Sequence, residues 1–168
     1  MSRSTPWKTR RRKQIPDFPI RIEKLSHEGR GLARWGERIL FVDGALPREL
    51  ATVRVIGKSS RTAEAIATDI LVASTLRAQP ECTHASICGG CSLQHLPHHA
   101  QLEHKHQTLD ELMSREGVPL KTVAYLPTLT SSTLGYRRRA RLGVRWVQAK
   151  DRLLIGFRER ASNFIADI

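Results

Sequence analysis

The sequence predicts a mainly β protein with one helix. Three observations support this: short runs of alternating apolar and polar residues between Pro19 and Ile70, one stretch with helical periodicity after Pro97, and a return to strand-like patterns after Lys121. Aromatic residues make up only 5% of the chain. The core is therefore expected to consist mostly of Leu, Ile, Val and Ala.

Residues 18–75 are predicted to form an OB-like barrel of five antiparallel strands. The segments "PIRIEKL", "ATVRVIG" and "TAEAIATDI" alternate with period two, and "GRGLARWGERILFVDG" contains two short runs broken at Gly36. Pro80 closes this unit, and a cysteine-rich loop is assigned to residues 76–96.

Residues 97–118 are predicted to form an amphipathic helix that stops at Gly117. Its apolar stripe consists of Leu102, Leu109, Leu112 and Met113. If exposed, this stripe would favour self-association, although a monomer is expected. Four histidines also fall on the helix, and a solvated face explains them better than a metal site does: His98, His99, His104 and His106.

Residues 119–168 are predicted to form an antiparallel meander from "YRRRARLGVRWV", "RLLIGFR" and "NFIADI". The last predicted strand runs to Ile168 without a closing turn. We therefore expect this unit to be an incomplete central domain and the chain to be the N-terminal part of a longer protein.

The charge of the chain predicts a polyanionic partner. The formal net charge is +12 and the sequence pI is about 10.6, and nucleic acid is the commonest partner of such chains. Residues 1–17 are expected to be a basic disordered tail. The sequence contains neither a secretory signal nor an apolar run of membrane-spanning length, which predicts a cytoplasmic protein without membrane contact.

Two sets of arginines are candidates for contacting RNA. As an extended strand, "YRRRARLGVRWV" would place four arginines on one face, where phosphates could neutralise them: Arg137, Arg139, Arg141 and Arg145. A solvated edge with acids from neighbouring strands is the alternative. The barrel adds a second basic surface, with Trp35 and Phe41 as possible stacking platforms, although Phe41 suits the core better: Arg30, Arg34, Arg54, Lys58 and Arg61.

The cysteine spacing predicts a metal or cluster site. Cys82, Cys88 and Cys91 lie within ten residues, with Gly89 and Gly90 between the last two. Small glycines would let the backbone pass close to the thiolates. The residues alone leave two ligand sets open: zinc held by three cysteines and His95, or an iron–sulfur cluster completed by a distant fourth ligand.

Several motifs resemble the N-terminal part of bacterial 23S ribosomal RNA (uracil-C5)-methyltransferases. They are "CTHASICGGCSLQH", "GYRRRARL", the "GFR" of residues 156–158, and the TRAM-like "EGRGLARWGERILFVDGALPRELATVRV". The resemblance spans about residues 18–168 and implies a TRAM barrel, a [4Fe-4S] cluster and binding to 23S ribosomal RNA.

The resemblance also implies individual roles. It makes Cys82, Cys88 and Cys91 cluster ligands, leaves His95 as a loop residue, and places a fourth cysteine beyond Ile168. Members of the family methylate C5 of a uracil with S-adenosyl-L-methionine. This chain has no glycine-rich loop for that cofactor and no cysteine left as a nucleophile, so we expect it to lack catalytic and cofactor-binding residues and to be inactive alone. The alternatives are a non-enzymatic RNA-binding module with a Cys3His zinc site and a free-standing TRAM-type adaptor.

Overall fold

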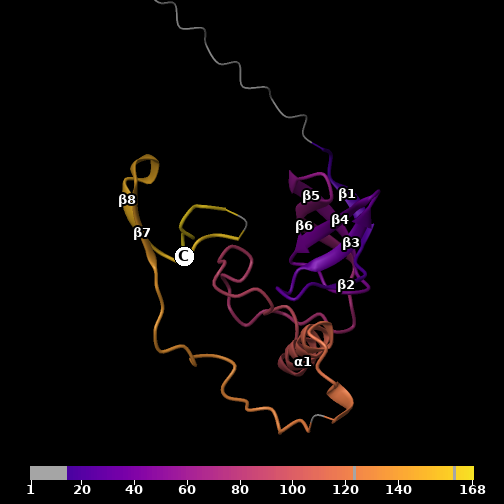
Figure 1. Ribbon diagram of the computed structural model, residues 1–168. Coiled ribbons are helices and arrows are strands. Elements are labelled where there is room, and N and C mark those ends of the chain that lie inside the picture. Colours follow the sequence, from indigo (N-terminus) through magenta and orange to yellow (C-terminus); the bar gives the residue numbers. More distant parts are fainter. Residues whose placement is uncertain (1–14, 123, 161) are drawn as a thin grey trace, which may run out of the picture.

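The computed structural model describes residues 15–122, 124–160 and 162–168 and confirms a mainly β fold with one α-helix. A six-stranded barrel lies on one side and a two-stranded hairpin on the other, with the cysteine loop and the last residues of the chain between them (Figure 1). Most of the predicted basic tail, residues 1–14, lies outside the described residues. Within the described ranges, no helix is long and apolar enough to span a membrane.

The barrel is built from strands in the order β1-β5-β6-β4-β3-β2. Neighbouring strands pair antiparallel except β4 and β6, which are parallel. The prediction of five antiparallel strands was therefore wrong in the number of strands and in this one pairing. The backbone N–H of Ile22 donates to Glu49, and that of Glu23 donates to Leu32, so the chain passes from the β5 ladder to the β3 ladder and closes the sheet. The strands are β1 (Phe18–Arg21), β2 (Lys24–Leu25), β3 (Gly31–Trp35), β4 (Arg38–Asp43), β5 (Leu50–Lys58) and β6 (Thr62–Val72).

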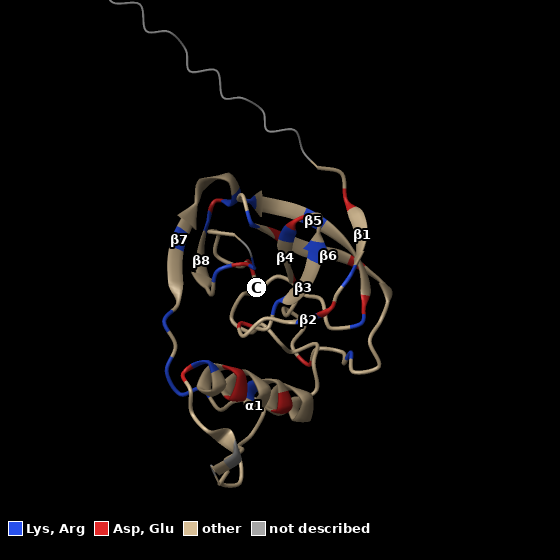
Figure 2. Cartoon of the chain, turned by 45° about the vertical axis from the view of Figure 1, so that its right-hand side comes forward, with Lys and Arg blue, Asp and Glu red and all other residues tan. Residues whose placement is uncertain are grey.

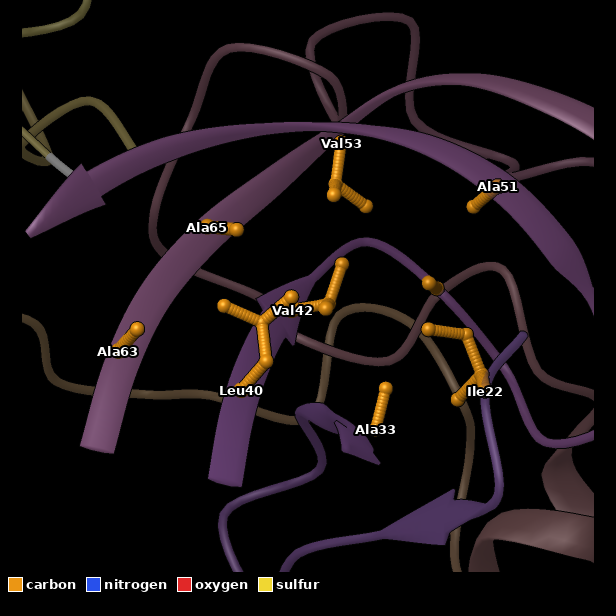
Figure 3. Packing of buried hydrophobic residues seen from close by; sticks show 9 residues of the cluster. Ile22, Ala33, Leu40, Val42, Ala51, Val53, Ala63 and Ala65 are labelled. Atoms are coloured by element: carbon orange, nitrogen blue, oxygen red, sulfur yellow. The ribbon is translucent and has the colours of Figure 1, made fainter. Parts of the chain in front are cut away.

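The barrel core is aliphatic, as the low aromatic content predicted. Leu40 and Val42 alternate with outward residues along β4 and are fully buried, and Val53 on β5 faces them (Figure 3). Several alanines belong to the same buried cluster, including Ala33, Ala51, Ala63 and Ala65. The period-two pattern of the sequence thus arises from one buried face per strand.

Helix α1 (His98–Arg115) packs against the barrel through a small contact. Ala100 at its N-terminal end joins Leu46 and Leu96 in a second buried cluster. The predicted apolar stripe is largely uncovered, because Leu109, Leu112 and Met113 are exposed and Leu102 is half-buried. Self-association through this stripe stays a prediction.

The C-terminal part differs from the predicted meander. A 3-10 turn, η1 (Leu120–Thr122), is followed by an irregular segment, and β7 (Gly143–Val147) then pairs with β8 (Arg152–Gly156) across η2 (Gln148–Lys150). The predicted third strand is reduced to a single bridge between Arg158 and Ile165.

The prediction that residues 136–147 form one long strand was wrong, because the strand begins only at Gly143. The register of the hairpin explains this limit. Gly143 pairs with Gly156, and beyond Gly156 the chain turns to pair with the cysteine loop at Cys88. Within the described residues, no partner strand therefore holds Arg137, Arg139 and Arg141 on a common face. Among the four predicted arginines only Arg145 lies in β7.

Candidate functional site

The cysteine loop docks against the chain that follows β8. Cys88 forms an isolated antiparallel bridge with Glu159. The Gly89 N–H donates to the Arg158 carbonyl (2.8 Å), and the Arg160 N–H donates to the Ile87 carbonyl (2.9 Å). These bonds join two segments that are about seventy residues apart in sequence.

The two glycines of the loop are required by this docking. A Cβ atom on Gly89 would lie 2.8 Å from the Arg158 carbonyl oxygen, and one on Gly90 would lie 2.9 Å from the Phe157 ring. The Gly90 N–H also points to the Cys88 sulfur at 3.4 Å. The glycines therefore serve a close backbone approach as predicted, although their nearest neighbours are residues 157 and 158.

The three thiols do not converge on a common point. Cys82 and Cys88 are half-buried, Cys91 is exposed, and all three are free. Within the described residues, no group of three His, Cys, Asp or Glu side chains is arranged to hold a metal ion. In this arrangement the loop fits neither an iron–sulfur cluster nor a Cys3His zinc ion, and both ligand sets stay predictions.

His95 lies in a buried charged junction between the barrel and the loop. It is 6% exposed, and no hydrogen-bond partner for its Nε2 is found in the described part of the chain. Burial and the positive charges of Arg77 and Arg160 lower its pKa to about 4, against the opposing effect of Glu49 and Asp43. The imidazole is therefore neutral at physiological pH.

Two arginines in this junction hold the parts of the molecule together. Arg77 pairs with the buried Glu49 (2.6 Å), which also accepts hydrogen bonds from the backbone of Leu46 and Ser74. Burial raises the pKa of Glu49, but these bonds outweigh it and leave the pKa below its usual range. Arg160 pairs with Asp43 of β4 at 3.3 Å and donates to the Cys91 carbonyl at 2.5 Å.

A cleft of about 650 Å³ opens where these parts meet. Asp43 lines it from the barrel, Gly89, Cys91 and Ser92 from the cysteine loop, and residues 141–143 and 156–160 from the hairpin and its flanks. Arg141, Arg158 and Arg160 all contribute to its lining. Of these, sequence reasoning identified only Arg141 as a candidate, because Arg158 and Arg160 reach the site only through the docking of the loop.

The predicted arginines of the barrel differ in whether a carboxylate already pairs with them. Arg30 pairs with Glu28 (2.5 Å) and Glu64 (3.5 Å) and stacks over Phe41 at 4.6 Å. Arg54 likewise pairs with Asp17 at 2.7 Å. Arg34 and Arg61 are exposed, and no carboxylate among the described residues pairs with either.

Trp35 and Phe41, the possible stacking platforms, are both half-buried. Trp35 stacks on Phe18 with ring centroids 5.5 Å apart and packs against the core. Phe41 lies under Arg30 and outside the buried core cluster. Neither ring is thus a freely exposed platform.

The C-terminal arginines are exposed and carry little compensating charge. They appear as the blue stretch leading into β7 in Figure 2. Within the part of the chain that the structure describes, no ion pair involves Arg137, Arg139, Arg141 or Arg145. Arg137 instead lies over the rings of Tyr136 and Phe157, at 5.9 and 5.7 Å.

Comparison with known proteins places the barrel in a family. Residues 17–68 match the TRAM domain family. The chain carries a TRAM domain. This TRAM domain covers all of β1–β5 and most of β6, and the cysteine loop, α1 and the hairpin lie outside it.

Beyond the TRAM domain, the chain is related to part of the 23S rRNA (uracil-C5)-methyltransferases, which confirms the resemblance. It is 42% identical over 161 residues to "23S rRNA (uracil(1939)-C(5))-methyltransferase RlmD" of Alcanivorax borkumensis, covering 95% of this chain and 36% of that protein. The protein of the same name from Hahella chejuensis is 41% identical over 162 residues, with the same coverage. That of Francisella tularensis subsp. novicida is 43% identical over 152 residues, covering 90% and 34%. The chain spans about a third of the length of these relatives.

Proposed function

We propose that this chain is the RNA-binding, cluster-bearing part of an enzyme that methylates C5 of a uracil in 23S ribosomal RNA, with S-adenosyl-L-methionine as methyl donor. The observation that carries the proposal is the similarity to the named methyltransferases along 95% of the chain. Because the chain spans about a third of those relatives, its own share of the reaction is binding and orienting the RNA, and we expect no methyl transfer by the chain alone.

The charge distribution supports RNA as the partner. The chain has a net charge of +12, and part of it comes from exposed arginines between residues 137 and 145. Among the described residues, no carboxylate pairs with these arginines. Arginine binds phosphate through two parallel hydrogen bonds, which suits it to an RNA backbone. The exposed Arg34 and Arg61 add a second basic area on the TRAM domain.

We further propose that Cys82, Cys88 and Cys91 ligate a [4Fe-4S] cluster together with a fourth ligand that is not a cysteine of this chain. The support is chemical: three free thiols lie close in sequence, and their glycines allow a tight backbone path. Binding would require the loop to draw the thiols together, and the cluster would then fix the loop's conformation.

RNA binding is tested by titrating the full chain into a labelled fragment of 23S ribosomal RNA at several salt concentrations. We expect the affinity to fall steeply with salt, because phosphate contacts release counterions. The Arg139→Ala variant should weaken binding and flatten the salt dependence, and Arg115→Ala, which also removes one positive charge, is the control. An absence of binding at low salt would reject the RNA-binding function.

The cluster is tested by anaerobic reconstitution with iron and sulfide. We expect a brown protein with broad visible absorbance, and loss of that absorbance in Cys88→Ser. A colourless protein that retains stoichiometric zinc would replace the cluster by the zinc alternative.

A further inference from the structure

We infer that the cleft between the cysteine loop and the hairpin accommodates a single-stranded segment of RNA, with Arg141 and Arg158 binding its phosphates. This inference rests on the proposed RNA-binding function, applies to the docked loop without the proposed cluster, and specifies where the strand enters. Arg158 had no RNA-contacting role in the sequence-based prediction, and the docking of the loop is what places it at the cleft.

The size of the cleft suits a nucleotide of a single strand. Pockets of about 300–1,000 Å³ enclose small organic ligands, and the cleft measures about 650 Å³. One wall is formed by Gly89, Cys91 and Ser92 of the cysteine loop. RNA-binding proteins that read single strands take up unstacked bases in sites of this kind.

The charges around the cleft leave two cations without partners. Asp43 is engaged by Arg160, and Glu159 accepts a hydrogen bond from Ser162 at 2.9 Å. Among the described residues, the Arg158 guanidinium donates a hydrogen bond only to the neutral amide oxygen of Asn163, at 3.4 Å. With Arg141 similarly unpaired in the described part of the chain, the lining has three arginines against the carboxylates of Asp43 and Glu159, and an anion would neutralise the remaining positive charge.

The lining also contains apolar surface, which a nucleotide uses and a free phosphate does not. Leu142 is 47% exposed and lines the cleft together with Phe157. Arg137 covers part of the Phe157 ring, with its guanidinium 5.7 Å from the ring centroid. A base against this apolar surface and a phosphate against the two arginines would satisfy both parts of the lining.

The test measures binding of the full chain to a labelled single-stranded RNA of about 12 nucleotides, and to the same strand annealed to its complement. We expect Arg141→Ala and Arg158→Ala each to weaken single-strand binding about tenfold at low salt. Each should also reduce the slope of log affinity against log salt by about 0.7. Arg115→Ala, which changes the net charge equally at the end of α1, should have a smaller effect on both quantities.

Two further variants keep the test decisive. Arg158→Lys retains the charge but loses the two-pronged geometry, so it should bind with intermediate affinity. Arg141 makes no hydrogen bond within the described residues, so Arg141→Ala remains informative if the Arg158 changes unfold the hairpin. Far-ultraviolet circular dichroism checks the fold of each variant.

The possible outcomes separate the two proposals. If the chain binds RNA but the two alanine variants behave like Arg115→Ala, the cleft is wrong and the RNA-binding function stands. If the chain binds no RNA, both fail. If the duplex binds as tightly as the single strand, and the alanine variants weaken both equally, the single-strand preference is overturned. If polyglutamate displaces the labelled RNA as effectively as unlabelled RNA does at equal charge concentration, the cleft is only a general anion site.

Discussion

The TRAM domain and the C-terminal hairpin are both β structures, yet they bury their side chains very differently. Leu40, Val42 and Val53 of the barrel are fully buried, whereas Val144, Trp146 and Ile155 of the hairpin are each more than half exposed. The barrel has six paired strands and the hairpin only two. An isolated two-stranded unit is marginally stable in water, so the hairpin depends on its contact with the cysteine loop.

The same two regions also differ in whether their arginines form ion pairs. In the TRAM domain, Arg30 and Arg54 are neutralised by carboxylates of the same domain. Between residues 136 and 145 the arginines have no such partners among the described residues. The barrel is therefore well packed and partly neutralised in charge, whereas the C-terminal region exposes both apolar and cationic side chains.

The largest expected effect comes from truncating the same residue type in the two regions. Leu40 is fully buried and Leu153 is 50% exposed. We expect Leu40→Ala to lower the free energy of unfolding by about 3 kcal/mol and Leu153→Ala to change it by less than about 0.5 kcal/mol. Urea unfolding followed by circular dichroism measures both. Similar losses would show that the hairpin is as well packed as the barrel.

The next effect concerns pH at the junction of the two regions. The pKa of His95 is about 4 in the folded protein against 6.5 for the ordinary group. Between these values only the unfolded chain binds the proton, so the free energy of unfolding should fall as the pH drops from 6.5 to 4, by about 3 kcal/mol. His95→Asn should remove this slope, and the exposed His84→Asn should leave it in place.

Glu49 adds a separate loss at lower pH. Its pKa lies below the ordinary value of 4.5, so its stabilising effect is present above that value and disappears as the pH falls further. A slope that survives in His95→Asn between pH 6.5 and 4.5 would assign the effect to another group.

A smaller effect is expected where the cysteine loop meets the hairpin flank. In Gly89→Ala the new Cβ would lie 2.8 Å from a backbone oxygen of Arg158, so the docked segments must separate. We expect a cost of about 2 kcal/mol and about tenfold faster labelling of the Cys88 thiol by a maleimide. Gly57→Ala is the matched control, because its nearest contact would be an ordinary 3.6 Å. Equal labelling in both variants would mean that the docking does not protect Cys88.

The smallest effect should appear between two arginines of the TRAM domain. We expect Arg34→Ala to weaken RNA binding about twofold and to flatten its salt dependence. Arg30→Ala should leave the salt slope unchanged, because Glu28 and Glu64 already neutralise this guanidinium. The slopes come from the same titrations with 23S ribosomal RNA. A flatter slope in Arg30→Ala would show that RNA displaces these carboxylates.

The barrel was predictable because each strand buries one face, so that apolar and polar residues alternate along the sequence. The strand at Leu50–Lys58 follows this pattern throughout, whereas Thr62–Val72 follows it only at its start, where Ala63 and Ala65 are buried. "PIRIEKL" was predicted as one strand, and the structure divides it into Phe18–Arg21 and Lys24–Leu25, a break that the period of two does not indicate. The position of α1 was also predictable, but its burial was not, since the pattern does not say what covers an apolar stripe.

The hairpin and the site were less predictable because they depend on contacts between distant segments. "YRRRARL" alternates like a strand, but whether it pairs is decided by where its partner turns away, at Gly156. The two glycines after Cys88 predicted that another part of the chain lies close to the backbone there, but the sequence did not indicate that this part is residues 157 and 158. Arg158 and Arg160 meet the loop across about seventy residues, and no local pattern signals that meeting.

The bend at Ile22 has a consequence for how this chain meets other chains. Because β1 and β2 are consecutive parts of one bent segment, the barrel sheet ends where it begins and offers few open strand edges for further pairing. In the described residues, β7 and β8 pair only with each other, so each keeps one edge open. Addition of a strand from another molecule would therefore begin at the hairpin, with its exposed Trp146 and Ile155, and not at the barrel.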